Sequence, residues 1–436
     1  MERLLHYVWQ HRLYDSTVLQ TTDGQRLEVI DPGLHNEDAG PDYLGAQLKI
    51  DGITWAGNVE IHTKSSDWVA HGHDQDPAYE NVILHVVEQA NQQVTTQSGK
   101  PIPQVELRIP DHVSANYQAL LHEEHFPPCY RAVASLPRLI VRQWLDALSI
   151  ERLEQKMQRI NRIADQTGGD WETVCFRTMA RAFGFGINGE AMEEWSSLVP
   201  LSAAGKHRDQ LLQIEALFLG QAGLLDDTQA LPDDHYYQSL MREYQFLSHK
   251  FGLRPMPREH WKLLRLRPYN FPQVRLSQLA NLYCRGQVNL SRLLEIKDIK
   301  DARQLLSTEA TPYWQTHFAS STVSGRQRKS LGQASLDSLI INAVVPLLFA
   351  YGRHRKRDSY LQKALSLLTG LGAEENKYTR IWREAGLPVH TAADSQALIQ
   401  LRTKYCHGHD CLRCRFGYEY LKATGIYRSE DFLREQ

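Results

Sequence analysis

Alternating hydrophobic and polar residues recur through the first 125 positions, and such alternation predicts β-strands. Asp-Gly pairs at positions 23–24 and 51–52 are typical of hairpin turns between strands. The polar segment 66–81 predicts a short helix or an ordered loop. The strand pattern covers residues 17–31, 46–50, 54–64, 82–87 and 104–109.

The pattern changes to a helical period after residue 130. Apolar residues recur at three- and four-residue steps from Leu139 to Ile163, which predicts one long amphipathic helix. Pro137 stands where this helix would begin and Gly168 where it would end. Further periodic segments extend to residue 424 without a fixed repeat.

These patterns predict an α+β protein with two domains. A mixed α/β sheet domain occupies residues 1–125, and an irregular all-helical domain occupies residues 130–436. The length of 436 residues suits such a division, since domains average roughly 150 residues.

Composition narrows the class of protein. Hydrophobic residues make up 42% of the chain and charged residues 23%, which excludes a disordered protein. The longest apolar run, residues 339–351, contains Asn342 and Pro346 and is too short to span a bilayer. The N-terminal residues lack the apolar run of a signal peptide. We therefore expect a soluble, cytoplasmic protein without a membrane partner.

The net charge of −2 conceals an asymmetry between the two halves. Residues 1–125 carry 19 Asp and Glu against 7 Lys and Arg, and they hold ten of the 19 histidines. The remaining residues have a balance of +10. Carboxylates and imidazoles are ligands for divalent metals, whereas a basic surface attracts polyanions.

Candidate chemistry begins on the predicted strand 54–64. Residues two apart on a strand share a face, so Glu60, His62 and Lys64 point the same way. Asp42 opens the preceding strand and can lie beside them if the two strands pair. Two neighbouring carboxylates repel each other unless a divalent cation lies between them, which favours a metal site.

Pro41-Asp42 and the run Glu60-Ile61-His62 resemble the signature of the PD-(D/E)xK nuclease superfamily. The resemblance implies an αβββαβ core in which Asp42 and Glu60 hold Mg²⁺ or Mn²⁺. His62 replaces the usual lysine, and mismatch-nicking members of the superfamily also use a histidine-containing arrangement there. The resemblance thus implies that His62, or Lys64 one strand step further, orients the attacking water.

Other acids and histidines follow in the segment 67–85. His71 and His73 are separated by one residue, which suits two ligands on an extended segment, and Asp76 follows them. We predict that these three residues are further metal ligands. The alternatives are a polar loop with hydrogen-bonded histidines, or a zinc-dependent hydrolase centre built from His and Asp.

Three cysteines cluster near the C-terminus. Cys406, Cys411 and Cys414 have soft-metal spacing. His407 or His409 would complete a zinc site. Alternatively Cys129 would complete an iron–sulfur site, as some PD-(D/E)xK nucleases pair one upstream cysteine with three downstream ones. The alternative is that the cysteines pack on a helix.

Two basic clusters in the helical half are candidates for phosphate contacts. The alternative for each is a solvated helix end. They consist of Arg326, Arg328 and Lys329, and of Arg353, Arg355, Lys356 and Arg357.

Taken whole, the chain also resembles an uncharacterised bacterial domain family, through the segments GPDY, GNVEIHTKSSDW, HGHDQDPAY, ILHVV and YCHGHDCLRC. That resemblance implies a shared fold and no activity. Our leading hypothesis is a divalent-metal-dependent nuclease acting on nucleic acid, with DNA as the first choice. One alternative is a non-catalytic scaffold that binds nucleic acid or protein on a degenerate nuclease fold. The other is a His/Asp metal-dependent hydrolase of small substrates.

Overall fold

A computed structural model of the chain describes residues 2–225, 234–319, 322–323, 325 and 327–424. The chain divides into two compact units. Unit 1 comprises residues 1–142, 384–387 and 401–436, and unit 2 comprises residues 143–383 and 388–400. The C-terminal segment, which the periodicity assigned to the helical domain, thus belongs to the unit that contains the sheet.

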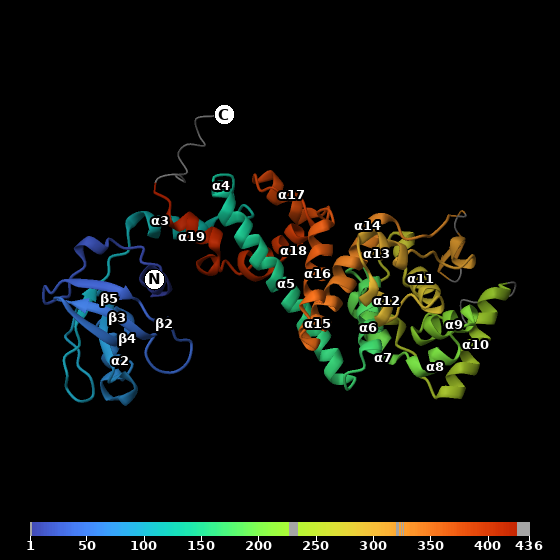
Figure 1. Cartoon of the computed structure of the whole chain (residues 1–436), viewed down its shortest axis with the longest axis horizontal. Coiled ribbons are helices and arrows are strands. Elements are labelled where there is room, and N and C mark those ends of the chain that lie inside the picture. Colours follow the sequence, from blue (N-terminus) through green and yellow to red (C-terminus); the bar gives the residue numbers. More distant parts are fainter. Residues whose placement is uncertain (1, 226–233, 320–321, 324, 326, 425–436) are drawn as a thin grey trace. The chain divides into compact units, whose positions relative to one another are not determined.

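Unit 1 is built on a mixed six-stranded sheet with the order β1-β3-β4-β5-β6, and β2 pairs with β3 outside this path (Figure 1). The pairs β1–β3 and β3–β4 are antiparallel, whereas β4–β5 and β5–β6 are parallel. This confirms the predicted N-terminal mixed sheet. The strands are β1 (Leu27–Asp31), β2 (Leu34–His35), β3 (Tyr43–Ile50), β4 (Ile53–Lys64), β5 (Val82–Gln89) and β6 (Gln104–Glu106).

A two-residue turn joins the strands that carry the candidate site. Asp51 and Gly52 have φ values of 47° and 84°, the left-handed conformation that a type I′ hairpin turn requires. The turn pairs Ile50 with Ile53, and a β-bulge between Tyr43 and Ala46 shifts the register by one residue so that Tyr43 lies opposite Val59. Residues 59–62 of β4 are all buried, so this part of the strand is covered on both faces.

Helices from distant parts of the chain complete unit 1. The C-terminal helix α19 packs on α3, and the Nδ2 of Asn116 donates hydrogen bonds to the backbone oxygens of Tyr420, Leu421 and Ala423 (Figure 1). These bonds add partners to carbonyls at the end of α19, of which that of Tyr420 also accepts the N–H of Ala423. The helices are α1 (Glu2–Gln10), α2 (Asp67–Ala70), α3 (Asp111–His122), α4 (Tyr130–Val133) and α19 (Arg415–Lys422).

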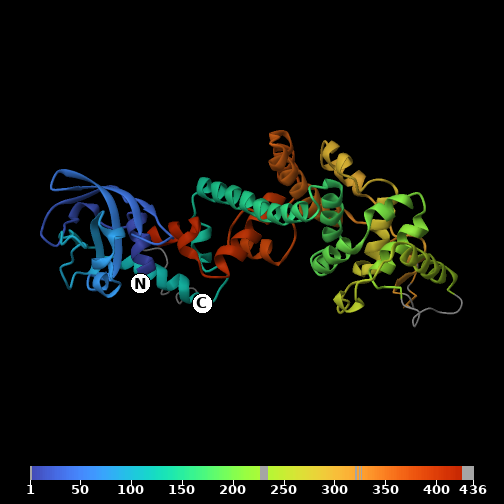
Figure 2. The same cartoon turned by 90° about the horizontal axis from the view of Figure 1, so that it is seen from below.

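Unit 2 is almost wholly helical, as Figure 2 shows, and one small hairpin of β7 (His317–Ala319) and β8 (Thr322–Val323) interrupts the helices. The long predicted helix is confirmed as α5 (Arg138–Gln166), whose first residues belong to unit 1. Asp170 caps α6 by accepting the backbone N–H groups of Glu172 and Thr173. The other helices are α6 (Trp171–Phe183), α7 (Gly189–Leu198), α8 (Leu201–Lys206), α9 (Leu211–Gln221), α10 (His235–Phe251), α11 (Pro272–Cys284), α12 (Leu290–Glu295), α13 (Ile299–Leu306), α14 (Gln333–Leu339), α15 (Val345–Arg355), α16 (Asp358–Gly370), α17 (Lys377–Glu384) and α18 (Ala392–Gln400).

One helical stretch is long and apolar enough to cross a membrane. It runs continuously from residue 333 to residue 355 through α14, a π-helical turn and α15. The structure buries 61% of its most apolar window inside the protein. The expectation that the run 339–351 is too short to span a bilayer is therefore wrong for the helix that contains it, although burial of this degree is also that of a core helix.

Candidate metal centre

Asp42 and Glu60 lie side by side where β3 begins next to β4. The backbone N–H of Asp42 donates to Oε2 of Glu60 at 3.0 Å, and the N–H of Ile61 donates to Oδ2 of Asp42 at 2.9 Å. Glu60 is 4% exposed. The hairpin register therefore brings the two acids together, as the spacing predicted.

Three histidines converge beside Glu60. Nε2 of His62 lies 3.1 Å from Nδ1 of His71, and one ligand atom from each of His62, His71 and His73 lies within 4.8 Å of the others. Oε1 of Glu60 lies 3.2 Å from Nε2 of His73 and 3.6 Å from Nε2 of His62. Three imidazole nitrogens and a carboxylate oxygen are a donor set typical of transition-metal sites.

The local sequence explains how His71 and His73 reach the sheet. The chain leaves β4 through the short helix α2, whose Trp68 is fully buried, and Gly72 then adopts a left-handed φ of 77°. That conformation places the two histidines on either side of a tight bend and favours glycine. The ring of Tyr79 stacks on His73 at a centroid distance of 3.8 Å and holds it against Glu60.

Burial shifts the pKa values of the buried members of this site. Removal from water, with a smaller contribution from the charges of His73 and His71, lowers the pKa of His62 to about 4. Burial raises the pKa values of Glu60 and Asp42. Neutral imidazoles are the form that binds a metal, and a bound cation would favour the ionised carboxylates.

His85 lies behind His62 on the neighbouring strand β5. Its Nε2 is 2.9 Å from Nδ1 of His62, its side chain is fully buried, and burial lowers its pKa to about 3. Nδ1 of His85 is buried without a hydrogen-bond partner in the described part of the chain. A second imidazole in this place holds the ring of His62 in position, with Nε2 of His62 facing His71.

Two other predicted residues lie outside this group of ligands. The side chain of Lys64 is exposed, and its backbone N–H donates to Asp67. The carboxylate of Asp76 is exposed and accepts the N–H of Ala78, so it caps a short turn. Lys64 is two residues from His62 along β4, whereas the carboxylate of Asp76 is already hydrogen-bonded to Ala78.

Sequence reasoning missed His6 as a neighbour of the site. Nε2 of His6, on α1, lies 3.9 Å from Oδ2 of Asp42. Since α1 is distant along the chain and no motif links it to β3, only the tertiary structure reveals this neighbour.

Comparison with protein families gives one match, to a family described as "Protein of unknown function (DUF2851)", over residues 2–377. The chain belongs to this family. This confirms the expected membership of an uncharacterised family, and it adds no activity. Neither the curated proteins nor the solved structures contain a match.

Four buried cysteines form a second cluster in unit 1. Cys129 precedes α4, Cys406 ends a π-helical turn, and Cys411 and Cys414 precede α19. Burial raises the pKa of the Cys129 thiol well above its usual value, and the charges of Cys414 and Cys411 raise it further, so these thiols are close neighbours. Burial and the charges of Cys414, Cys129 and Cys411 have the same effect on Cys406.

The structure favours Cys129 over His407 as the fourth member of this cluster. His407 is exposed, whereas Cys129 is 8% exposed. Phe126 carries the guanidinium of Arg402 over its ring at 4.5 Å, so the segments that precede Cys129 and Cys406 are in contact. The family match ends at residue 377, before the other three cysteines.

The basic clusters differ in exposure. Arg353, Arg355, Lys356 and Arg357 are exposed around the end of α15. Lys329 is 1% exposed and donates to the backbone oxygen of His317, and Arg328 is paired with Glu309 at 2.7 Å. Arg326 lies outside the described residues.

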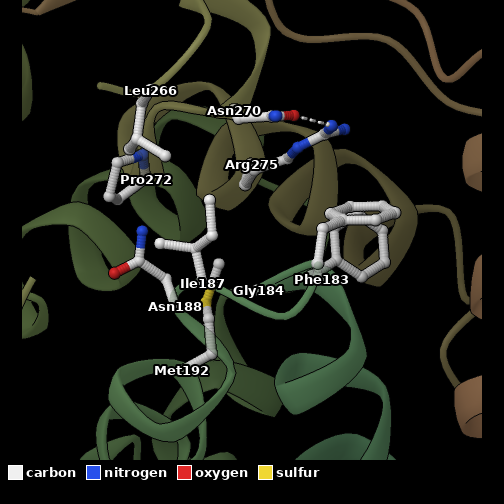
Figure 3. Close-up of a pocket in the computed structure, with 10 residues that line it drawn as sticks. Phe183, Gly184, Ile187, Asn188, Met192, Leu266, Asn270, Pro272 and Arg275 are labelled. Carbon is white, nitrogen blue, oxygen red and sulfur yellow. Dashed lines mark hydrogen bonds between the residues drawn. The ribbon is translucent and has the colours of Figure 1, made fainter. Parts of the chain in front are cut away.

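Figure 3 shows a small void in unit 2 that has no room for a ligand. Its volume is about 10 Å³, and Phe183, Ile187 and Met192 supply apolar walls. The guanidinium of Arg275 reaches into it and donates to Asn270 at 2.6 Å (Figure 3). We therefore regard this void as a feature of packing.

Proposed function

We propose that this protein is a divalent-metal-dependent hydrolase that cleaves phosphodiester bonds in nucleic acid, with DNA as the first substrate to test. The convergence of His62, His71, His73 and Glu60 supports this proposal most strongly. The order of elements supports it, because α1, β1, β2, β3, β4, α2 and β5 follow the order of an αβββαβ nuclease core with the two-residue strand β2 inserted. The protein would act in the cytoplasm.

In this proposal the imidazoles and Glu60 hold the ion. This ligand set favours Zn²⁺ or Mn²⁺ over Mg²⁺, which prefers an all-oxygen shell. The bound ion would supply a water of lowered pKa and positive charge for the phosphate. Asp42, which lies beside Glu60 and whose pKa is raised by burial, would act as the general base, and His85 would orient His62.

The test compares DNA cleavage by the wild type and by the variant Asp42→Ala/Glu60→Ala. Supercoiled, linear and single-stranded DNA are incubated with Mn²⁺ or Zn²⁺. We expect cleavage by the wild type and by the control Asp23→Ala/Glu28→Ala, which removes two exposed acids of the same unit. Equal cleavage by Asp42→Ala/Glu60→Ala would refute the proposal.

Two further measurements separate the alternatives. Hydrolysis of a small phosphodiester without cleavage of DNA would favour the hydrolase of small substrates, for which three imidazoles are an equally suitable ligand set. Absence of metal binding in a titration with Mn²⁺ and Zn²⁺ would favour the non-catalytic scaffold.

We also propose that Cys129, Cys406, Cys411 and Cys414 hold a structural metal centre. Burial raises the pKa of Cys411 to about 12, so this thiol stays protonated unless a bound cation stabilises the thiolate. Four cysteines without a histidine are a ligand set for either zinc or an iron–sulfur cluster, and we propose the cluster.

Analysis of the anaerobically purified protein tests the cysteine centre. We expect iron and acid-labile sulfide, both retained in Cys284→Ser, whose cysteine lies in unit 2, and lost in Cys414→Ser. Zinc without sulfide would refute the cluster, and a metal-free protein would refute the centre.

A further inference from the structure

Unit 2 contains a positively charged cleft. None of the residues that line it belongs to the two predicted basic clusters. The cleft has a volume of about 530 Å³ and lies between α5, α6 and the segment 338–346. Among the described residues that line it there is no Asp or Glu. Its cations are Arg152, Lys156, Arg159, Arg162 and Arg181.

Helical spacing explains why the cations share one wall. Four of them are on α5, separated by steps of four, three and three residues, and such steps keep side chains on one face. Ten residues of helix rise about 15 Å, so the row from Arg152 to Arg162 is long enough to meet more than one phosphate group.

Nearby acids neutralise only part of this charge. Glu193 pairs with Arg181 and lies 3.9 Å from Arg159. Burial lowers the pKa of Arg159, and the charge of Arg181 lowers it further. Glu190, outside the cleft lining, raises the pKa of Arg159, and Glu374 raises that of Arg152. Burial lowers the pKa of Lys156 to about 7, so this residue is only partly charged at neutral pH. The four arginines still outnumber these three carboxylates, an excess of positive charge that an anion would relieve.

Arginine donors at the cleft remain available for a ligand, whereas the ammonium of Lys156 already has three partners. Nε of Arg152 is buried without a hydrogen-bond partner in the described chain. Lys156 is held in place by Ile341 O at 3.3 Å, Asn342 Oδ1 at 2.9 Å and Gln396 Oε1 at 2.7 Å. Arg162 is exposed at the mouth.

We propose that this cleft binds the phosphodiester backbone of single-stranded nucleic acid. Arginine is well suited to phosphate, because its planar guanidinium donates two parallel hydrogen bonds. A volume of about 530 Å³ is that of a small-molecule pocket and excludes a duplex, whereas a strand can place a phosphate and its nucleoside there. The choice of nucleic acid as the ligand rests on the proposed function. The existence of an anion site in the cleft does not depend on that function.

Fluorescence anisotropy tests the proposal by measuring the binding of a fluorescein-labelled oligo-dT of about ten nucleotides. This length lies within the site sizes of single-strand binding proteins. EDTA is present, so that cleavage cannot interfere. We expect Arg159→Glu/Arg162→Glu to weaken binding at least about tenfold and to lower the slope of log K against log salt by about 0.7 for each lost phosphate contact. The control is Arg292→Glu/Lys300→Glu, an equal charge change at exposed residues of unit 2.

Arg162→Glu alone, at an exposed side chain, keeps the test valid if the double variant fails to fold. Equal losses in the variants and the control would overturn the proposal, because binding would then depend on net charge alone. Displacement of the oligonucleotide by equimolar tripolyphosphate would also overturn it, since the ligand would then be a free polyphosphate. Asp42→Ala/Glu60→Ala should bind normally, so a failure of the hydrolase proposal is distinguishable from a failure of this one.

Discussion

Nε2 of His62 lies 3.1 Å from Nδ1 of His71, although one residue is on the central strand β4 and the other follows α2. The contact joins the strand that carries Glu60 to the loop that carries His73. It is the relationship on which the proposed metal centre depends, because three imidazoles then share one small space.

The centre predicts a specific loss of metal affinity on substitution of His71. We expect His71→Ala to weaken Zn²⁺ binding at least about tenfold, since loss of a mere outer-shell partner already weakens metal sites 10- to 100-fold. Isothermal titration calorimetry measures the effect. His122→Ala, at an exposed position on α3, is the control and should bind like the wild type. Unchanged affinity in His71→Ala would exclude His71 as a ligand.

Gly57 allows β4 and β5 to approach each other closely. A Cβ atom at this position would lie 2.4 Å from Cγ2 of Ile83 and 2.7 Å from the backbone oxygen of Asn81. We expect Gly57→Ala to lower the free energy of unfolding by about 1–3 kcal/mol, the usual effect of overpacking. Urea denaturation measures the change. Gly408→Ala, whose Cβ would meet nothing within 4 Å, should have little effect.

Glu215 makes stability depend on pH in unit 2. It is fully buried, and burial raises its pKa although Thr311 and Tyr236 donate hydrogen bonds to it. The unfolded chain therefore loses this proton at lower pH than the folded chain, so the free energy of unfolding falls as pH rises above the ordinary pKa of 4.5. Between pH 4.5 and 7, we expect Glu215→Gln to remove the decrease in the free energy of unfolding that Glu215 causes.

Urea denaturation across that pH range, compared with the exposed control Glu295→Gln, measures the effect of Glu215. A pH dependence identical in wild type and Glu215→Gln would contradict the raised pKa.

Asn116 attaches the C-terminal helix to α3 in unit 1. Because its Nδ2 donates to three carbonyl oxygens at the end of α19, Asn116→Ala leaves these groups without that partner. We expect a local destabilisation on the order of 1–2 kcal/mol, seen as faster hydrogen exchange of the α19 amides. Gln118→Ala, at an exposed position on the same helix, should leave exchange unchanged. Equal exchange in the two variants would show that Asn116 does not anchor the helix.

Local patterns in the sequence predicted the elements that carry the site. The Asp51-Gly52 turn and the alternation around it specify the hairpin, and that hairpin brings Asp42 to Glu60. The three- and four-residue steps likewise specify α5. Such features follow from residues that are close together in the sequence, so backbone geometry and side-chain period determine them.

Other features needed the tertiary structure. The burial of His85 behind His62, the approach of His6 and the joining of Cys129 to the C-terminal cysteines depend on which distant segments pack together. The cationic face of α5 was open to prediction from its spacing, but the excess of cations over nearby carboxylates was not. The sequence alone therefore determined the elements and the chemical character of the candidate site, whereas long-range packing decided its membership, because burial and neighbouring charge are properties of the folded chain.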